Sequence, residues 1–317
     1  MMDSTATVLV AGSANLDFVV RAAHIPAPGE TVLGREFRTF PGGKGANQAV
    51  ACARAGAAST RMLLALGDDA YAAPLEASLR EAGVTLQIVR DAGVATGTAF
   101  VCVSDGGENA ITVAPGANAL LKPEHLPSLE GITHLLLQLE TPLDTVTAYA
   151  RAAKAAGVSV VLNAAPARAL PEALLAALDV LIVNEAELAT VSASSGRVAD
   201  ALASLRVPCV VVTLGGRGAC ARAGGEYLLQ TAFAVEPVDT TGAGDTFCGA
   251  LTAALGRGEP LRDALRFACA AAALACTRLG AQASIPARSE VDNLLRTAQD
   301  NQPQQLRALA AHCGLPT

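Results

Sequence analysis

Five short runs of apolar residues recur along the chain. They are TVLVAG at 7–12, THLLLQ at 133–138, VSVVLN at 158–163, DVLIVN at 179–184 and VPCVVVTLG at 207–215. Short, continuously apolar runs are typical of strands that are covered on both faces. Ala- and Leu-rich helical stretches lie between them, at 143–156, 172–178 and 198–205. This alternation predicts an α/β fold, with a doubly wound, mostly parallel sheet flanked by helices.

Two segments do not follow this alternation. Residues 17–40 carry strand-like pieces around a Pro- and Gly-rich turn, and residues 97–113 carry two alternating strands around Asp105-Gly106-Gly107, a strong hairpin signal. We expect 17–40 and 97–113 to form a small β-sheet lid, and 1–16, 41–96 and 114–317 to form the α/β body. A lid of this kind could exclude water from a reaction. The alternative is an edge hairpin with no part in the chemistry.

Composition excludes several classes of protein. The chain has 317 residues, of which 51% are hydrophobic, and its net charge of −6 comes without any Lys/Arg cluster, which argues against a nucleic-acid partner. The eight cysteines form no C-x-x-C pair, and we expect buried thiols rather than disulfides or a zinc site. The N-terminus lacks a signal-peptide pattern, and the longest apolar run, at 267–276, falls short of the ~18 residues of a membrane span. We therefore expect a cytoplasmic protein.

A glycine cluster, FPGGKGANQAV at 40–50, is similar to a phosphate-binding loop. The standard pattern is G-x-x-x-x-G-K-[ST], in which backbone amides cradle phosphates and the hydroxyl reaches Mg²⁺. Here Lys44 is followed by Gly45, and Arg38 stands where the first glycine belongs. The match fails at both places, so this pattern alone does not assign the segment to phosphate.

A second cluster, EPVDTTGAGDTFCGA at 236–250, fits an anion better. Gly242 and Gly244 allow a tight turn from a strand-like segment into a helix, whose unpaired N-terminal amides favour an anion. Asp245 falls in the first helical turn beside that anion. Asp239 and Asp245 could be ordinary helix-capping residues, but a carboxylate beside a phosphate also suits a base that activates an attacking hydroxyl.

These two clusters together resemble the signature motifs of the ribokinase-like sugar kinases. The matching segments are GGKGANQAVA at 42–51 and DTTGAGDTF at 239–247, and AGSANLD, PAPGET, GDD, QLETP, NAAPAR, NEAE, TLGGRG and TRLGAQASIP match in order between residues 11 and 286. The resemblance runs from about residue 7 to about 296, and the first motif has the form found in the ribose-phosphorylating members. It implies ATP-dependent phosphorylation of D-ribose at O5, giving D-ribose 5-phosphate and ADP.

The resemblance also implies a set of substrate residues. Those matching the sugar side of the family's site are Asn15, Asp17, Gly43, Lys44, Gly45, Ala46, Asn47, Glu140 and Asp245. A carboxylate such as that of Asp17 suits a sugar diol, because its hydrogen bonds to hydroxyls are charge-assisted. Whether Lys44 also reaches a phosphate remains open from the sequence.

The phosphoryl-transfer side is implied in the same way. Asp245 matches the catalytic base, and Gly242, Ala243 and Gly244 match the anion hole. The nucleotide positions are Asn184, Thr213, Leu214, Gly215, Gly216, Arg217, Gly218, Gly244 and Cys269. Cys269 departs from the family, which commonly has His or Asn there, and a side-chain hydrogen bond to ATP is therefore in doubt at that position. Glu187, in an N-x-x-E motif, matches a Mg²⁺ residue that acts through water.

The ribose-phosphorylating members of the family are activated by a monovalent cation, typically K⁺, and their lobes pair across a dimer, so the resemblance implies K⁺ activation and a homodimer for this chain. The residues matching the cation site are Asp239, Thr241, Ala275, Arg278, Gly280 and Ser284, most of them contributing carbonyls. Residues 298–317 extend past the resemblance. QQLRALAAH within them could form a short helix, but we expect a poorly ordered terminus.

Other functions stay open. The acceptor could instead be deoxyribose, fructose, a nucleoside such as adenosine or pseudouridine, or a keto-deoxy sugar acid. A non-catalytic sugar- or nucleotide-binding regulator would be expected to lose the TGAGD motif, which is intact at 241–245. A dinucleotide-dependent dehydrogenase needs G-x-G-x-x-G after the first strand, and AGSANL at 11–16 lacks it.

Overall fold

The large sheet of the molecule has nine strands. The structure is a computed structural model that describes residues 6–316; residues 1–5 and Thr317, which belong to the predicted body, lie outside the described residues. The strands are β1 (Thr7–Ala11), β4 (Ser59–Gly67), β5 (Thr85–Asp91), β8 (His134–Leu137), β9 (Ser159–Asn163), β10 (Val180–Asn184), β11 (Cys209–Thr213), β12 (Gly218–Ala223) and β13 (Glu226–Thr231). Their order is β13-β12-β11-β10-β9-β8-β1-β4-β5, and all pairs are parallel except β11–β12 and β12–β13.

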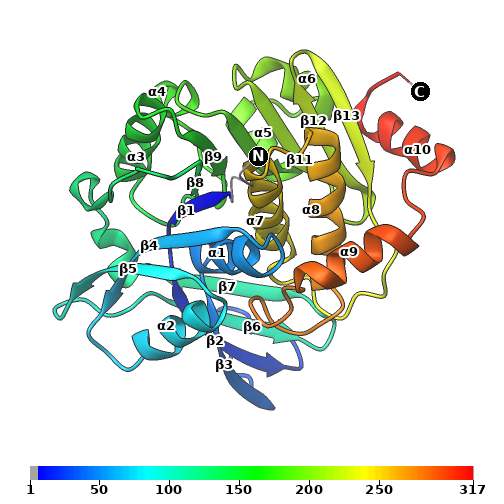
Figure 1. Cartoon of the computed structure of the whole chain (residues 1–317). Coiled ribbons are helices and arrows are strands. Elements are labelled where there is room, and N and C mark those ends of the chain that lie inside the picture. Colours follow the sequence, from blue (N-terminus) through cyan, green and yellow to red (C-terminus); the bar gives the residue numbers. More distant parts are fainter. Residues whose placement is uncertain (1–5, 317) are drawn as a thin grey trace.

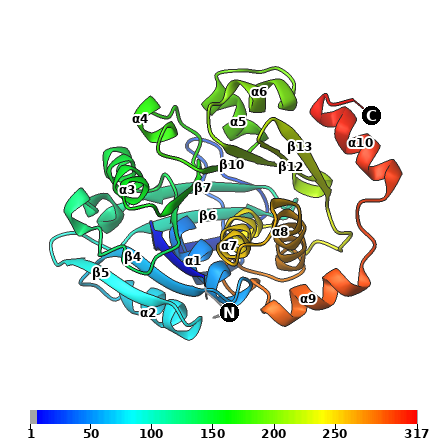
Figure 2. The ribbon, with the colours of Figure 1, turned by 45° about the horizontal axis from the view of Figure 1, so that its top comes forward.

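Helices cover both faces of this sheet (Figures 1 and 2). Those on one face are α1 (Lys44–Arg54), α2 (Ala72–Glu81), α7 (Ala243–Gly256), α8 (Leu261–Ala275) and α9 (Arg288–Thr297). Those on the other are α3 (Leu143–Ala155), α4 (Glu172–Leu175), α5 (Glu185–Ser192), α6 (Val198–Ser204) and α10 (Pro303–Cys313). Alternate residues of β1 enter the two cores, with Val8 and Val10 on one side and Leu9 and Ala11 on the other. The predicted doubly wound α/β fold is confirmed.

The five predicted strand runs correspond to β1, β8, β9, β10 and β11. Their side chains are almost wholly buried, as the continuous apolar runs require. Strands β4, β5, β12 and β13 lie outside those runs. The described part of the body also has three short 3-10 helices, η1 (Gly116–Leu120), η2 (Pro123–His125) and η3 (Gly215–Arg217). Among the described residues, no helix has the length and apolar character that crossing a membrane requires.

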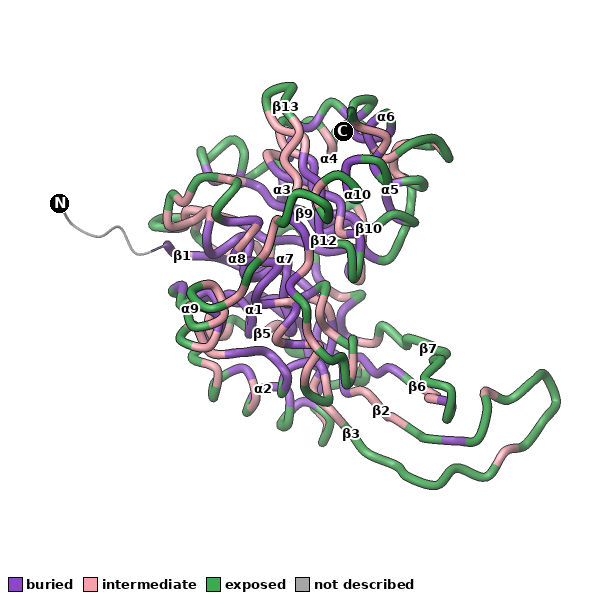
Figure 3. The backbone as a smooth tube through the Cα atoms, turned by 90° about the vertical axis from the view of Figure 1, so that its right-hand side faces the viewer, coloured by how far each residue is buried: buried purple, intermediate pink, exposed green. Residues whose placement is uncertain are grey.

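The second sheet is small and projects from the body (Figure 3). Its strands are β2 (Asn15–Ala22), β3 (Glu36–Gly42), β6 (Thr98–Ser104) and β7 (Asn109–Ala114), in the order β3-β2-β6-β7. The predicted hairpin around Asp105 is confirmed as β6–β7, which pair antiparallel, whereas β2 and β6 run parallel. Both segments that break the strand–helix alternation therefore meet in one sheet.

The expectation of a poorly ordered C-terminus is wrong. Residues Pro303–Cys313 form helix α10, with a proline in its first turn and Gly314 in a left-handed conformation at its end. Leu309, Ala310 and Cys313 are buried, and two of them join the core that contains α5 and α6. Figure 1 shows α10 beside β13, the edge strand of the large sheet, which the helix partly covers.

Candidate active site

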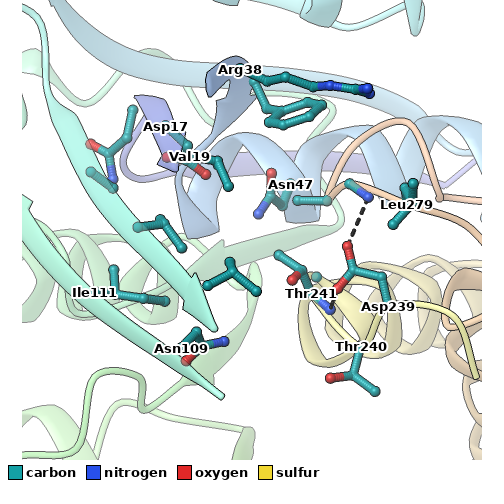
Figure 4. A pocket seen from close by; sticks show the side chains of 18 of the residues that line it. Asp17, Val19, Arg38, Asn47, Asn109, Ile111, Asp239, Thr240, Thr241 and Leu279 are labelled. Carbon is teal, nitrogen blue, oxygen red and sulfur yellow. Dashed lines mark hydrogen bonds between the residues drawn. The ribbon is translucent and has the colours of Figure 1, made fainter. Parts of the chain in front are cut away.

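A cleft of about 810 Å³ lies between the small sheet and the body. Most of the predicted sugar residues line it: Asn15, Asp17, Gly43, Lys44, Asn47, Glu140 and Asp245. In Figure 4, Asp17 and Val19 from β2 and Ile111 from β7 lie on one side, and Asp239 and Thr241 lie on the other. The fold thus brings together residues that are as much as 230 positions apart in the chain.

The start of α1 lies at the junction of sheet and cleft. Gly43, the residue before the helix, has a φ of 89°, and a Cβ there would lie 2.7 Å from the amide nitrogen of Asn15. Only glycine fits both demands. Gly45 and Ala46 do not line the cleft, because they are buried behind it, where the Ala46 amide donates to the Ser13 carbonyl at 2.8 Å. Their predicted role in sugar contact therefore has no direct support in the structure.

Asp245 lies in the first turn of α7 and is buried at the floor of the cleft. Nδ2 of Asn47 donates to its Oδ2 at 2.9 Å, and Nε2 of Gln48 donates to its Oδ1 at 2.9 Å. Both donors come from consecutive residues of α1, so the packing of α1 against α7 sets the orientation of this carboxylate.

Behind Asp245 lies a network of amides that sequence reasoning missed. Gln48 also donates to Oδ1 of Asn163 at 3.0 Å, and its Oε1 accepts a hydrogen bond from Nε2 of Gln138 at 2.7 Å. All three amide residues are buried. A signal was present, because Gln138 and Asn163 directly follow or end apolar strand runs, at the sheet edge where open α/β folds bind ligands.

The surroundings of Asp17 disfavour the charged form of its carboxyl group. Burial, with the nearby charges of Glu140 and Asp245, raises its pKa to about 7. Its Oδ1 is buried and, among the described residues, has no hydrogen-bond partner; the same is true of Oδ1 of Asn47. Buried acceptors of this kind are costly unless a ligand supplies the donor, and sugar hydroxyls would do so.

A smaller pocket of about 160 Å³ shares Lys44, Gly242 and Asp245 with the cleft. Its other residues include Asn163, Asn184, Glu187, Thr213, Gly244 and Cys248. The Lys44 side chain therefore faces both spaces. The Asp245 carboxylate, followed by Glu140 and Glu187, raises the pKa of Lys44 against the opposing effect of burial, so its ammonium stays charged.

Asn184 and Glu187 cap the start of α5. The Glu187 amide donates to Oδ1 of Asn184, and the Asn184 amide donates to Oε2 of Glu187, each at 2.8 Å. This is a reciprocal capping box. Burial raises the pKa of Glu187, while the Asn184 amide and the Lys44 charge act in the opposite direction. Capping holds one carboxylate oxygen and leaves the other for a ligand in the pocket.

Helix α7 begins at this pocket. Its N-cap, Gly242, has a φ of 76°, in the left-handed region. The Ala243 amide donates to the Thr240 carbonyl at 3.2 Å, whereas no hydrogen bond among the described residues uses the amides of Gly242 or Gly244. Of the three amides predicted to form an anion hole, these two are the ones available to an anion.

The predicted nucleotide residues are only partly brought together. Thr213, Asn184 and Gly244 line the small pocket, and Gly215, Gly216 and Arg217 form an exposed turn after β11. Leu214 and Gly218 are buried. Cys269 lines neither space, because its side chain packs in the core along α8, where burial raises the pKa of its thiol to about 12.

The predicted cation residues lie on the loop before α7 and at and after the end of α8. Oδ1 of Asp239 accepts from the Thr241 amide and Oδ2 accepts from the Gly280 amide, both at 2.9 Å, which ties 239–241 to 275–284 (Figure 4). Burial opposes the charge, but these hydrogen bonds hold the pKa of Asp239 below its usual value. Ala275 and Ser284 are buried nearby, while Arg278 pairs with Glu290. Within residues 6–316, no cluster of three or more His, Cys, Asp or Glu could hold a metal ion.

This arrangement can bind a polyhydroxyl compound and an anion side by side. Asp245 lies where the cleft and the small pocket meet, with an ammonium and the start of a helix beside it. Such a site can take a proton from a hydroxyl in the cleft while stabilising negative charge in the pocket.

Comparisons with known proteins show which proteins this chain is similar to. The pfkB family of carbohydrate kinases matches residues 5–288. The chain is 39% identical over 293 residues to a ribokinase of Bacillus subtilis, covering 91% of this chain and 99% of that protein. A solved ribokinase of Thermotoga maritima has a TM-score of 0.85 at 38% identity, covering 92% of this chain and 100% of that one. The Arabidopsis thaliana ribokinase solved with ribose and ATP has a TM-score of 0.84 at 34% identity, covering 92% and 99%.

The match extends over most of the chain and includes both glycine clusters, which lie at the starts of α1 and α7. The chain is therefore a member of the pfkB family of carbohydrate kinases.

Proposed function

We propose that this chain transfers the γ-phosphoryl group of ATP to O5 of D-ribose, giving D-ribose 5-phosphate and ADP. The observation that carries the proposal is a pair of buried acceptors in the cleft beside Asp245, Oδ1 of Asp17 and Oδ1 of Asn47, which have no hydrogen-bond partner within residues 6–316. The similarity to ribokinases, one of them solved with ribose and ATP, supports this acceptor over others.

In the proposed reaction, the sugar lies in the cleft with its hydroxyls on Asp17, Asn15, Asn47 and Glu140. Asp245 takes the proton from the 5-hydroxyl as O5 attacks the γ-phosphorus. The new O5–P bond forms while the bond from the γ-phosphorus to the β–γ bridging oxygen breaks, and ADP leaves. Asn47 and Gln48 hold the carboxylate of Asp245 by one hydrogen bond on each oxygen, which orients it toward the cleft.

The phosphates would lie in the small pocket. There the amides of Gly242 and Gly244 and the Lys44 ammonium stabilise the charge that spreads over the transferring group. The adenosine part would extend toward Thr213 and the 215–218 turn. We propose that the small sheet acts as the lid that excludes water during transfer.

Two ions belong to the proposal. Mg²⁺ bound with ATP would neutralise phosphate charge, and Glu187, a buried residue that lines the pocket, would hold this ion through a water molecule. A monovalent cation such as K⁺ fits carbonyls of the two loops that Asp239 joins, since these loops are already held together. It would supply positive charge near the start of α7.

We also propose that the protein is cytoplasmic, since a kinase of this kind draws on the cytoplasmic ATP supply.

We further propose that the chain forms a homodimer. The outer face of the small sheet carries Phe37 and Phe100, which are 60% and 55% exposed and pack on either side of Phe18. A second copy of the chain would cover these rings. A clearly monomeric mass by light scattering at micromolar concentration would contradict the dimer.

The proposed activity is tested by an ADP-release assay with ATP and Mg²⁺ over a panel of pentoses, hexoses and nucleosides, with and without K⁺. We expect D-ribose to give the highest kcat/KM and K⁺ to raise it. Turnover of a nucleoside with no turnover of any sugar would overturn the ribose assignment, and no ADP release with any acceptor would overturn kinase activity.

A further inference from the structure

The C-terminal segment, residues 300–313, both covers the edge strand β13 and makes specific polar contacts with it. The family match ends at residue 288, and the relatives above correspond over their full lengths to about nine-tenths of this chain. Beyond that match, residues 300–313, here called the C-terminal strap, cross the end of β13 and continue as α10 (Figures 1 and 2). The first two residues of the strap make most of its polar contacts.

Asp300 joins two elements of the body. Its Oδ1 and Oδ2 accept from Nη2 and Nε of Arg266 on α8, at 2.8 and 2.9 Å, and Oδ2 also accepts from Nε2 of Gln230 on β13 at 3.0 Å. The Asp300 side chain is only 7% exposed, and the Arg266 guanidinium holds its pKa below the ordinary value. A two-pronged ion pair of this kind is geometrically specific, and removal of one partner leaves a buried charge.

Asn301 fastens the strap to the end of β13. Its Oδ1 accepts from the amide and the hydroxyl of Thr231, at 2.9 and 3.2 Å, and its own amide donates to that hydroxyl at 2.8 Å. Its Nδ2 donates to Oε1 of Gln230 at 2.9 Å. Asn301 has a φ of 55°, a left-handed conformation that Asn adopts more readily than most residues.

The end of β13 is in turn bonded to the 213–218 turn. Thr231 pairs with Gly218, and the Ala232 amide donates to the Arg217 carbonyl at 3.2 Å. A Cβ on Gly218 would lie 2.0 Å from the Gln230 carbonyl, so the two backbones are in direct contact. On the other side, Arg266 lies over the ring of Phe233, 5.7 Å from its centre, just after β13.

We propose that Asp300 and Asn301 are positioning residues of the nucleotide site. They fix α8 and the end of β13 relative to each other and so hold the 213–218 turn in the conformation that receives the adenosine part of ATP. They do not contact the nucleotide. The inference rests on the proposed function, which places ATP at this turn. A chain without the strap would have to order this turn when ATP binds, which weakens binding.

The test compares variants of the full-length protein. Asn301→Gly keeps the left-handed backbone and removes the side-chain hydrogen bonds, Asn301→Asp keeps the oxygen that accepts from Thr231, and Asp300→Asn removes the charge. Val291→Ala, at a buried position of α9 outside the strap, is the matched control for loss of stability. Calorimetric ATP binding, KM for ATP, KM for ribose, kcat and Tm are measured for each.

We expect Asn301→Gly and Asp300→Asn to weaken ATP binding and raise KM for ATP about tenfold, which corresponds to the loss of one or two hydrogen bonds. Asn301→Asp should recover part of this loss, KM for ribose and kcat should change less than twofold, and Val291→Ala should lower Tm without affecting ATP.

ATP affinity within twofold of wild type in both strap variants would overturn the inference, as would an equal loss in Val291→Ala. The same measurements separate this from failure of the proposed function, because in that case the wild-type protein itself would not bind or turn over ATP.

Discussion

Nε2 of Gln48 lies 2.9 Å from Oδ1 of Asp245 and 3.0 Å from Oδ1 of Asn163. Gln48 is completely buried, and its own oxygen is held by Gln138. The orientation of the proposed base is therefore fixed from behind by a chain of amides, while Asn47 holds its other oxygen from the side of the cleft.

Replacement of Gln48 by Met should lower kcat about tenfold or more, because a hydrogen bond to a charged group contributes roughly 1.5–3 kcal/mol. KM for ribose should change little, since Gln48 does not line the cleft. Steady-state kinetics, with a thermal melt to confirm folding, measures this effect. A folded variant with kcat within twofold of wild type would show that Asp245 does not depend on Gln48.

Asp17 should make ribose binding depend on pH. Its pKa is about 7 in the folded protein, raised by burial and by Glu140 and Asp245, so the carboxylate that binds hydroxyls is lost as pH falls below 7. KM for ribose should therefore rise between pH 8 and pH 6, and Asp17→Asn should remove this dependence while raising KM throughout. A KM for ribose that stays constant over this range in the wild type would contradict the role.

The same residue should limit stability. The pKa of Asp17 in the fold, about 7, exceeds its ordinary value of 3.8, so the folded chain keeps a proton that the unfolded chain releases, and stability falls as pH rises from about 4 to 7. Asp17→Asn has no such loss, and its Tm should exceed that of wild type by a few degrees at pH 8 and by less at pH 5. A lower Tm for the variant at pH 8 would mean that Asp17 stabilises the fold.

Glu187 should set the requirement for Mg²⁺. Glu187→Gln keeps the shape of the capping residue but removes the charge in the pocket, so the Mg²⁺ concentration for half-maximal activity should rise roughly tenfold. Glu185→Gln is the matched control, because Glu185 is on the same helical turn but is exposed and pairs with His312. Equal Mg²⁺ dependence in the two variants would exclude a role of Glu187 with the metal.

The sequence predicted the parts of this molecule that depend on local pattern. Strands β1 and β8 to β11 are buried on both faces and so appear as continuous apolar runs. Strand β5 forms one edge of the large sheet, at the other end from β13, and is half exposed with Arg90 and Asp91 at its end. A half-exposed edge strand has no continuous apolar run, so the sequence predicts it less clearly.

Features that depend on tertiary contacts could not be predicted from the sequence alone. Helix α10 is stable because Leu309 and Cys313 are buried against a core formed by distant residues, which no local pattern reveals. Similarly, Asp245 and Asn47 could be assigned from motifs, whereas the role of Gln48 depends on the fold placing it beside Gln138 and Asn163.

The central claim is that Asp245 removes the proton from the attacking sugar hydroxyl, and Asp245→Asn tests it most directly. The substitution preserves the shape of the side chain, so ribose and ATP should still bind, while kcat for ADP release with ribose should fall ~10²–10⁴-fold. Calorimetric binding of both substrates to the variant, together with that loss of kcat, is the predicted result. A variant that folds, binds both substrates and keeps kcat near that of wild type would contradict the account.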